Sequence, residues 1–171
     1  MSAGQTRTGP KQTTPKYSVS ACLPGDLSEE ELATCLTIIR DGGAVAISLK
    51  KLQNTGMVAV ARKDGVIVGV GSIKRGRPDR AVEIAQESGF DFPRQTLELG
   101  YIAVSPQHRR QGISHQLVRA LVKAMPGGFF ATTDDDHMKK TLSVAGFTRH
   151  GGEWPGRRGQ LSLWLKQGTK P

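Results

Sequence analysis

The sequence predicts one α/β (α+β) domain built on a mixed, mostly antiparallel β-sheet of about six to seven strands flanked by helices. Its 171 residues are enough to bury a substantial core without disulfides or metals. In the first half, two apolar runs flank Lys63-Asp64-Gly65, a pattern typical of an antiparallel hairpin. In the second half, apolar runs alternate with amphipathic segments, which indicates crossover helices and therefore a mixed sheet.

The amino-terminal segment is expected to lie outside this domain. Residues 1–16 are dominated by Ser, Thr, Gly, Gln and Pro with three basic residues and no acid, so we predict a flexible basic tail. A strand over 17–23 follows. Ser28 and Glu31 then form a capping-box pattern, and the apolar spacing beyond them predicts a helix that ends at glycines 42–43.

The remaining elements follow from hydrophobic periodicity and from turn residues, such as the Pro-Gly-Gly at 126–128 that stops a helix. In chain order they are a short helix over 44–53, strands over 57–62 and 66–74, a helix over 80–88, a strand over 96–104, a helix over 113–124, a strand over 129–133, a helix over 137–145, and strands over 147–150 and 160–166. The predicted domain therefore spans residues 17–166, with a short carboxy-terminal tail over 167–171.

The segment between the strand ending at Val104 and the helix starting at Ile113 has the features of a phosphate-binding loop. The first N–H groups of a helix have no intrahelical partner, and the helix dipole adds partial positive charge there. Arg109 and Arg110 add full positive charges, and Gly112 allows a ligand to approach the backbone closely. A solvated charged loop is the alternative, but the glycine and the following helix favour phosphate binding.

These residues also carry a resemblance to a known family. The run Arg109-Arg110-Gln111-Gly112-Ile113-Ser114 resembles the acyl-CoA signature of the GNAT superfamily of N-acetyltransferases, Gln/Arg-x-x-Gly-x-Gly/Ala. Val104-x-Pro106 before it, Leu117 after it and Ala145-Gly146-Phe147 further on extend the match. Ser114 departs from the usual Gly or Ala but is also small. The resemblance implies the same order of strands and helices over residues 17–166.

The resemblance implies acetyl-CoA as cosubstrate and no metal. In the family, the strand that ends here at Val104 splays from its neighbour, its backbone pairs with the pantetheine arm, and loop amides hold the pyrophosphate. Asp135 stands where the family often has an Asn that touches this arm, although a helix N-cap is an alternative role. The acidic run 134–136 before His137 is better explained by helix capping than by metal binding. The implied cofactor-binding residues are Ile102, Ala103, Val104, Arg109, Arg110, Gln111, Gly112, Ile113, Ser114 and Asp135.

Acetyl transfer from a thioester to a primary amine by direct attack requires two proton transfers. Deprotonating a lysine-like amine with a pKa of about 10.4 costs roughly 4.6 kcal/mol at pH 7, whereas the departing thiolate needs only about 2 kcal/mol. A positioned base therefore matters more than a positioned acid. Glu98 is the predicted general base, because relatives with a similar strand commonly have a carboxylate there. A solvent-facing strand glutamate is the alternative.

The family's usual acid, a Tyr four residues before the Gly of the Gly-Phe pair, is replaced here by Leu142. Ser143 is the adjacent catalytic candidate, although it lies about 100° further round a helix. Three possibilities remain open without this Tyr. The thiolate leaves unassisted, a water protonates it, or the activity is reduced. Relatives often line the acceptor pocket from the last hairpin, so Arg157 and Arg158 are the predicted substrate-binding residues, and they favour an acidic or phosphorylated acceptor. A solvated turn is the alternative.

Charge and cysteine content leave other functions open. The 24 Lys and Arg against 15 Asp and Glu give a net charge of +9, which suits acidic partners or simply keeps the surface soluble. The missing Tyr leaves a catalytically weak acyl-CoA-binding module as one alternative to the enzyme, and the basic charge leaves a basic protein that acts on or binds nucleic acid as another. Cys22 and Cys35 indicate a reducing, cytoplasmic setting, and no apolar run approaches the length of a membrane span. The oligomeric state, monomer or homodimer, stays open.

Overall fold

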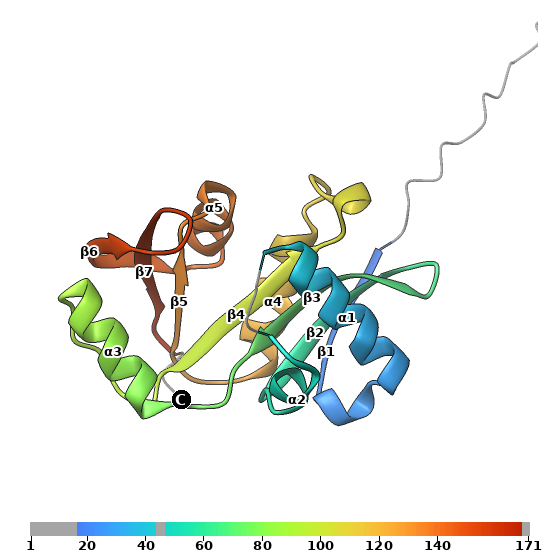
Figure 1. Ribbon diagram of the computed structural model, residues 1–171, viewed down its shortest axis with the longest axis horizontal. Helices are drawn as coiled ribbons and strands as arrows, with labels where there is room; N and C mark the ends of the chain where they lie inside the picture. The colour runs from blue at the N-terminus through green and yellow to red at the C-terminus, as the bar shows by residue number, and fades with distance from the viewer. Residues whose placement is uncertain (1–16, 44–46, 169–171) are drawn as a thin grey trace, which may run out of the picture.

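The computed structural model describes residues 17–43 and 47–168, which form a seven-stranded sheet in the order β1-β2-β3-β4-β5-β7-β6 with helices on both faces (Figure 1). Neighbouring strands are antiparallel except β4 and β5, which are parallel. The strands are β1 (Tyr17–Cys22), β2 (Met57–Lys63), β3 (Val66–Ile73), β4 (Leu97–Val104), β5 (Phe129–Thr133), β6 (Thr148–Pro155) and β7 (Gln160–Lys166). The helices are α1 (Glu29–Asp41), α2 (Leu49–Gln53), α3 (Pro78–Ser88), α4 (Ile113–Ala124) and α5 (Asp136–Val144).

The predicted fold class and the order of elements are confirmed. The capping box at α1 is present, because the Ser28 side chain accepts from the Glu31 N–H and the Glu31 carboxylate accepts from the Ser28 N–H. The hairpin turn at Asp64 and Gly65 also forms, with both residues at positive φ.

Several boundaries differ from prediction. The second helix begins only at Leu49, and residues 44–46 of the predicted helix lie outside the described residues, as do the predicted tail over 1–16 and residues 169–171. β6 continues past His150 to Pro155, because a bulge between His150 and Trp154 lets the strand resume pairing with β7. Short 3₁₀ turns at Pro24–Asp26 and Pro106–His108 were not predicted.

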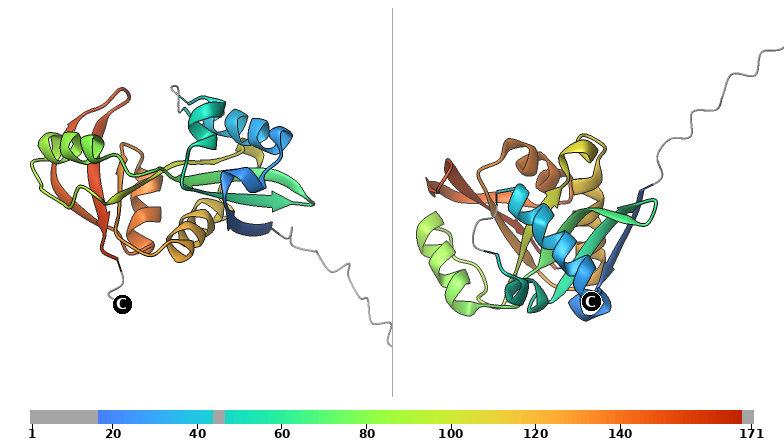
Figure 2. Two further views of the ribbon diagram at one scale, coloured as in Figure 1. Left: turned by 90° about the horizontal axis from the view of Figure 1, so that it is seen from below. Right: turned by 45° about the vertical axis from the view of Figure 1, so that its right-hand side comes forward.

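The core lies on both faces of the sheet. Along β2, Ala59 and Ala61 face one buried cluster with α4 and α5, whereas Val58 and Val60 face another with α1 and α2. This alternation is what a strand buried on both faces requires. In the left view of Figure 2, α1, α2 and α3 lie on one side of the sheet and α4 and α5 on the other.

Two features of the sheet position the site. β4 pairs with β5 only through Leu97–Phe129 and Glu98–Phe130, so the two strands diverge toward Val104. In addition, α3 is inserted between β3 and β4 and crosses to β6 and β7, where Ala81 and Ile84 pack with Trp154 (Figure 1). The gap between β4 and β5 is therefore bordered by elements from distant parts of the chain.

Candidate active site

The loop before α4 presents backbone N–H groups that the described part of the chain leaves without acceptors. Within residues 17–43 and 47–168, none of the N–H groups of residues 110–115 donates to a protein atom, and the first helical bond runs from Gln116 to the Gly112 carbonyl at 3.2 Å. Arg110 and Gly112 have φ angles of 62° and 72°, a left-handed conformation found in anion-binding backbone nests. A Cβ on Gly112 would meet no atom within 4 Å, so the space in front of this backbone is open.

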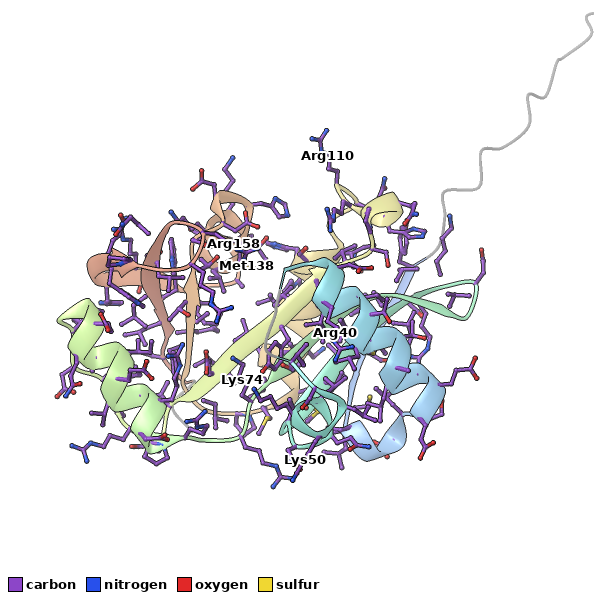
Figure 3. All side chains as sticks on the ribbon, in the orientation of Figure 1. Arg40, Lys50, Lys74, Arg110, Met138 and Arg158 are labelled. Carbon is purple, nitrogen blue, oxygen red and sulfur yellow. The ribbon has the colours of Figure 1, made fainter. Side chains whose placement is uncertain are left out.

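The two arginines of this loop have different roles in the structure. The Nε of Arg109 donates to the carbonyl of Val104 at 3.1 Å and so ties the loop to the end of β4. Arg110 is exposed and extends away from the body of the molecule (Figure 3). On the other side of the loop, the Nδ1 of His108 lies 3.1 Å from the Tyr17 hydroxyl of β1.

Two cavities lie in the gap between β4 and β5 and share Gly42, Ile102, Ala103, Asp135 and Met138 in their walls. We call the joined cavities the cleft. The cavity beside the loop, about 460 Å³, is lined by every predicted cofactor-binding residue except Gln111. The cavity at the other end, about 310 Å³, is lined by Glu98 among others. The structure thus places the predicted base and all of the predicted cofactor residues but Gln111 along one cleft.

Glu98 lies at the end of the cleft away from the loop, held between two cations. The Nζ of Lys74 is 3.2 Å from Oε1 of Glu98, and the Nε of Arg80 is 3.8 Å from Oε2. The Glu98 side chain is only 12% exposed. Gly100 makes room for this arrangement, because a Cβ there would come within 2.8 Å of Lys74 Cε. Glu98 is therefore an oriented carboxylate rather than a solvated one.

Tyr101 forms another wall of this end of the cleft. Its φ of 52° lies in a bulge between β3 and β4, and the Nζ of Lys74 is 4.5 Å from the centre of its ring. Burial, followed by the negative charge of Glu98, raises the pKa of the Tyr101 hydroxyl. The hydroxyl therefore stays protonated at neutral pH.

The α5 side of the cleft supplies no acid at the position where the resemblance places one. Leu142 is fully buried and lines the cleft, whereas Ser143 is exposed and lines neither cavity. Asp135 lines both cavities and also caps α5, since its Oδ1 accepts from the N–H of His137 at 2.8 Å. The capping role is thus present in the structure.

The last hairpin brings only one of its two arginines to the cleft. Arg158 lines the 310 Å³ cavity and reaches across it, because its Nη2 lies 3.7 Å from Oδ1 of Asp134 and a Cβ on Gly43 would collide with its Nη1. Figure 3 shows Arg158 and Met138 together near the top of this gap, with Lys74 further down. Arg157 is exposed and lines neither cavity.

Sequence reasoning missed Lys74 and Arg80, which line the same cavity as Glu98. Both come from the segment between β3 and β4, which contains four basic residues within residues 74–80. That local concentration of charge was a usable signal. Which of the four face Glu98 depends on the path of α3, and no local pattern encodes that path.

A mixed seven-stranded sheet that splays beside an amide-rich loop is the architecture of acetyltransferases of the GNAT type. The sequence model of the Acetyltransferase (GNAT) family matches residues 26–145. The chain therefore belongs to the GNAT acetyltransferase family, whose fold implies acyl-CoA-dependent acetyl transfer.

Several solved structures share this fold. A GNAT-family acetyltransferase from Streptococcus agalactiae is 16% identical, with a TM-score of 0.70 over 92% of this chain and 100% of that one. An acyl-CoA N-acyltransferase from Pseudomonas aeruginosa is 15% identical, with a TM-score of 0.65 over 88% and 99% of the two chains. N-acetylglutamate synthase from Neisseria gonorrhoeae, solved with coenzyme A and L-arginine, is 15% identical, with a TM-score of 0.58 over 89% and 34%. No curated protein matches the sequence as a relative.

Among residues 17–43 and 47–168, no three His, Cys, Asp or Glu side chains lie close enough together to hold a metal ion. No helix in those ranges is both long and apolar enough to span a membrane.

Proposed function

We propose that this protein transfers an acetyl group from acetyl-CoA to the primary amine of an acceptor by direct attack, with Glu98 as the general base. The amine nitrogen attacks the thioester carbonyl carbon, the C–S bond breaks, and coenzyme A leaves as a thiolate. The proton released by the amine goes to the Glu98 carboxylate, directly or through a water. The position of Glu98 at one end of the cleft, with the amide-rich loop at the other end, supports this role.

The observation that carries the proposal is the run of N–H groups over residues 110–115 without acceptors in the described chain, beside the 460 Å³ cavity that Arg110, Gly112, Ile113 and Ser114 line. A pyrophosphate offers the acceptor oxygens and negative charge that such a helix start favours. The splayed edge of β4 offers Ile102, Ala103 and Val104 to an extended arm, because β5 no longer pairs with them. We assign Arg109 a bracing role and also phosphate contact through its terminal nitrogens.

The test is thermal stabilisation by acetyl-CoA, with Gly112→Glu as the variant. A glutamate side chain would place bulk and negative charge in front of the amides, so the stabilisation should disappear. Gly89→Glu is a matched control, because Gly89 has nearly the same backbone angles (φ 69°, ψ 19° against 72°, 14°) and equally open space, yet caps α3. The Gly89→Glu variant should retain the full rise in melting temperature with acetyl-CoA. An unchanged melting temperature of the natural protein at millimolar acetyl-CoA would refute the proposal.

A catalytically weak acyl-CoA-binding module is the second candidate, and the buried, apolar Leu142 on the cleft wall favours it. The two functions differ in thiol release. An acetyltransferase liberates coenzyme A from acetyl-CoA when a suitable amine is present, whereas a binding module is stabilised by acetyl-CoA but releases none. Because a thiolate leaves without much help, we expect release. The proposed chemistry gives Ser143 no part.

A further inference from the structure

Three basic side chains surround the place where an acceptor amine would meet Glu98. Lys74 comes from the end of β3, Arg80 from the inserted helix α3 and Arg158 from the β6–β7 hairpin, and all three line the 310 Å³ cavity. Lys74 and Arg80 both contact the Glu98 carboxylate, at 3.2 and 3.8 Å. Glu98 and Asp135 line the same cavity, and Arg158 pairs with Asp134 at 3.7 Å, so cationic and anionic groups are mixed there.

An ammonium ion at Glu98 would lie beside Lys74 and Arg80, which already pair with that carboxylate. Like charges a few ångströms apart repel, so these two cations offset part of the attraction between Glu98 and a simple ammonium ion. An acceptor that also carries an anion avoids this penalty, because its own negative charge can pair with one of the cations. The mixed charges of the cavity thus suit a ligand that is itself both cationic and anionic.

The pair Lys74 and Arg80 already binds a carboxylate, that of Glu98. Arg80 makes the looser of the two contacts, its side chain is 27% exposed, and it also pairs with Glu83 at 3.1 Å on the outer side of α3. A guanidinium can bind a second carboxylate by donating two parallel hydrogen bonds to it. Arg80 can therefore exchange Glu98 for the carboxylate of a ligand, which leaves Glu98 free to face an amine.

We propose that the acceptor is a free α-amino acid whose carboxylate is bound by Arg80 while its amine faces Glu98. This inference rests on the acetyltransferase function proposed above. A cavity of about 310 Å³ is at the small end of ligand pockets and is sufficient for a metabolite of this size. Arg80 is then a specificity-determining residue that the insertion of α3 supplies to the site.

The experiment compares acceptors that differ only in the carboxylate. Coenzyme A release is measured with alanine against ethylamine, leucine against isoamylamine and phenylalanine against phenethylamine, and with the corresponding amino acid amides. We expect kcat/KM for each amino acid to exceed that for its amine and amide analogues by a factor on the order of ten or more. The reason is that each analogue loses a charged hydrogen-bonded pair. Equal or better activity with the amines or amides would overturn the inference.

Variants of Arg80 give a second readout. Arg80→Gln should raise KM for the amino acid on the order of tenfold and remove the preference over the amine, with the thermal shift by acetyl-CoA unchanged. Arg80→Lys should restore part of the preference. Arg77→Gln is the matched control, because Arg77 is 67% exposed and pairs with Asp79 at 2.8 Å outside the cleft. An Arg80→Gln enzyme that keeps the preference would also overturn the inference.

The outcomes separate the two proposals. A thermal shift with acetyl-CoA and thiol release that is as fast with plain amines as with amino acids would leave the acetyltransferase standing and remove only the amino acid acceptor. A thermal shift without thiol release for any amine or amino acid would indicate the binding module and likewise remove the acceptor. No thermal shift would remove both.

Discussion

Glu98 shows how one residue's neighbours define its chemistry. A strand glutamate is ordinarily solvated, but here Lys74 and Arg80 hold both carboxylate oxygens within a largely buried site. These contacts fix the orientation of the carboxylate and keep it at the end of the cleft. If Glu98 acts as the proposed base, the same contacts must loosen when an amine arrives, so the activity should depend on Glu98 and on both of its partners.

Replacing Glu98 with Gln should lower kcat at pH 7 by about 100-fold or more, because the amine then has no positioned base. The rate of the variant should rise about tenfold per pH unit until the pKa of the acceptor amine is reached, since only free amine reacts. The natural enzyme should show a shallower rise. Thiol release measured from pH 6 to 10 checks this, with the exposed Glu87→Gln as control. Equal pH profiles for the two variants would show that Glu98 is not the base.

Cys35 gives a second prediction at this scale. The side chain is fully buried in α1, and burial raises the pKa of its thiol from 9.0 to about 12. The folded protein therefore holds a proton that the unfolded chain loses above about pH 9, so stability from this residue is complete below that pH and falls as the pH rises toward 12.

Between pH 8 and 10 the natural protein should lose about 1.4 kcal/mol more unfolding free energy than Cys35→Ala. Urea unfolding of both proteins at the two pH values measures the difference, and titration of the groups that do not interact with Cys35 cancels in the comparison. Parallel losses in the two proteins would mean that the thiol ionises normally in the folded state.

The residues that could be placed from the sequence interact with neighbours close in the chain. Those that could not be placed interact with residues far along the chain. The amides of residues 110–115 depend on a local pattern, a strand, a glycine and a helix start, and the structure leaves them without acceptors in the described chain. The outward position of Ser143 also follows from helix geometry, since Leu142 is buried. Lys74 and Arg80 could not be assigned to Glu98, because their contacts span 24 and 18 residues.

At the scale of the element, the inserted helix α3 is placed by a glycine in a distant strand. Gly151 of β6 has a φ of 70°, and a Cβ there would collide with the carbonyl oxygen of Ser88 and lie 3.1 Å from Cβ of Phe90. The end of α3 therefore packs directly against the bulge of β6. The same bulge extends β6 beyond its predicted end, because local residue preferences do not reveal a partner across the sheet.

Gly151→Ala should therefore destabilise the fold by about 2 to 4 kcal/mol, from the positive φ and from the clash with α3. Gly152→Ala is a close control, because its nearest neighbour, the Ser88 oxygen, lies 3.9 Å from the added Cβ, and the change should stay within about 0.5 kcal/mol. Urea unfolding measures both. If α3 positions Arg80 as proposed, the surviving folded fraction of Gly151→Ala should also show a raised KM for the amino acid acceptor. Equal stability of the two variants would show that α3 does not need this glycine.

At the scale of the whole molecule, the sheet consists of two parts that meet at a short seam. β1 to β4 form one part and β5 to β7 the other, and the β4–β5 ladder contributes only two paired positions between them. The buried cluster that contains α4 and α5 spans the seam from one face, and the cleft opens along the rest of it. A ligand in the cleft therefore contacts both parts of the sheet, so ligand binding should also stabilise the association of the two parts.

Hydrogen exchange tests where that ligand lies. The N–H groups of residues 110–115 have no acceptor within residues 17–43 and 47–168, so they should exchange quickly in the free protein and slowly once coenzyme A is bound. Protection should extend to the edge of β4 over residues 102–104 and to the start of α5, because these line the same cleft. The turn at Asp64 and Gly65 lines neither cavity and should exchange at one rate in both states. Should coenzyme A raise the melting temperature yet leave exchange over 110–115 unchanged, the pyrophosphate binds elsewhere, because a phosphate hydrogen-bonded to these amides must slow their exchange.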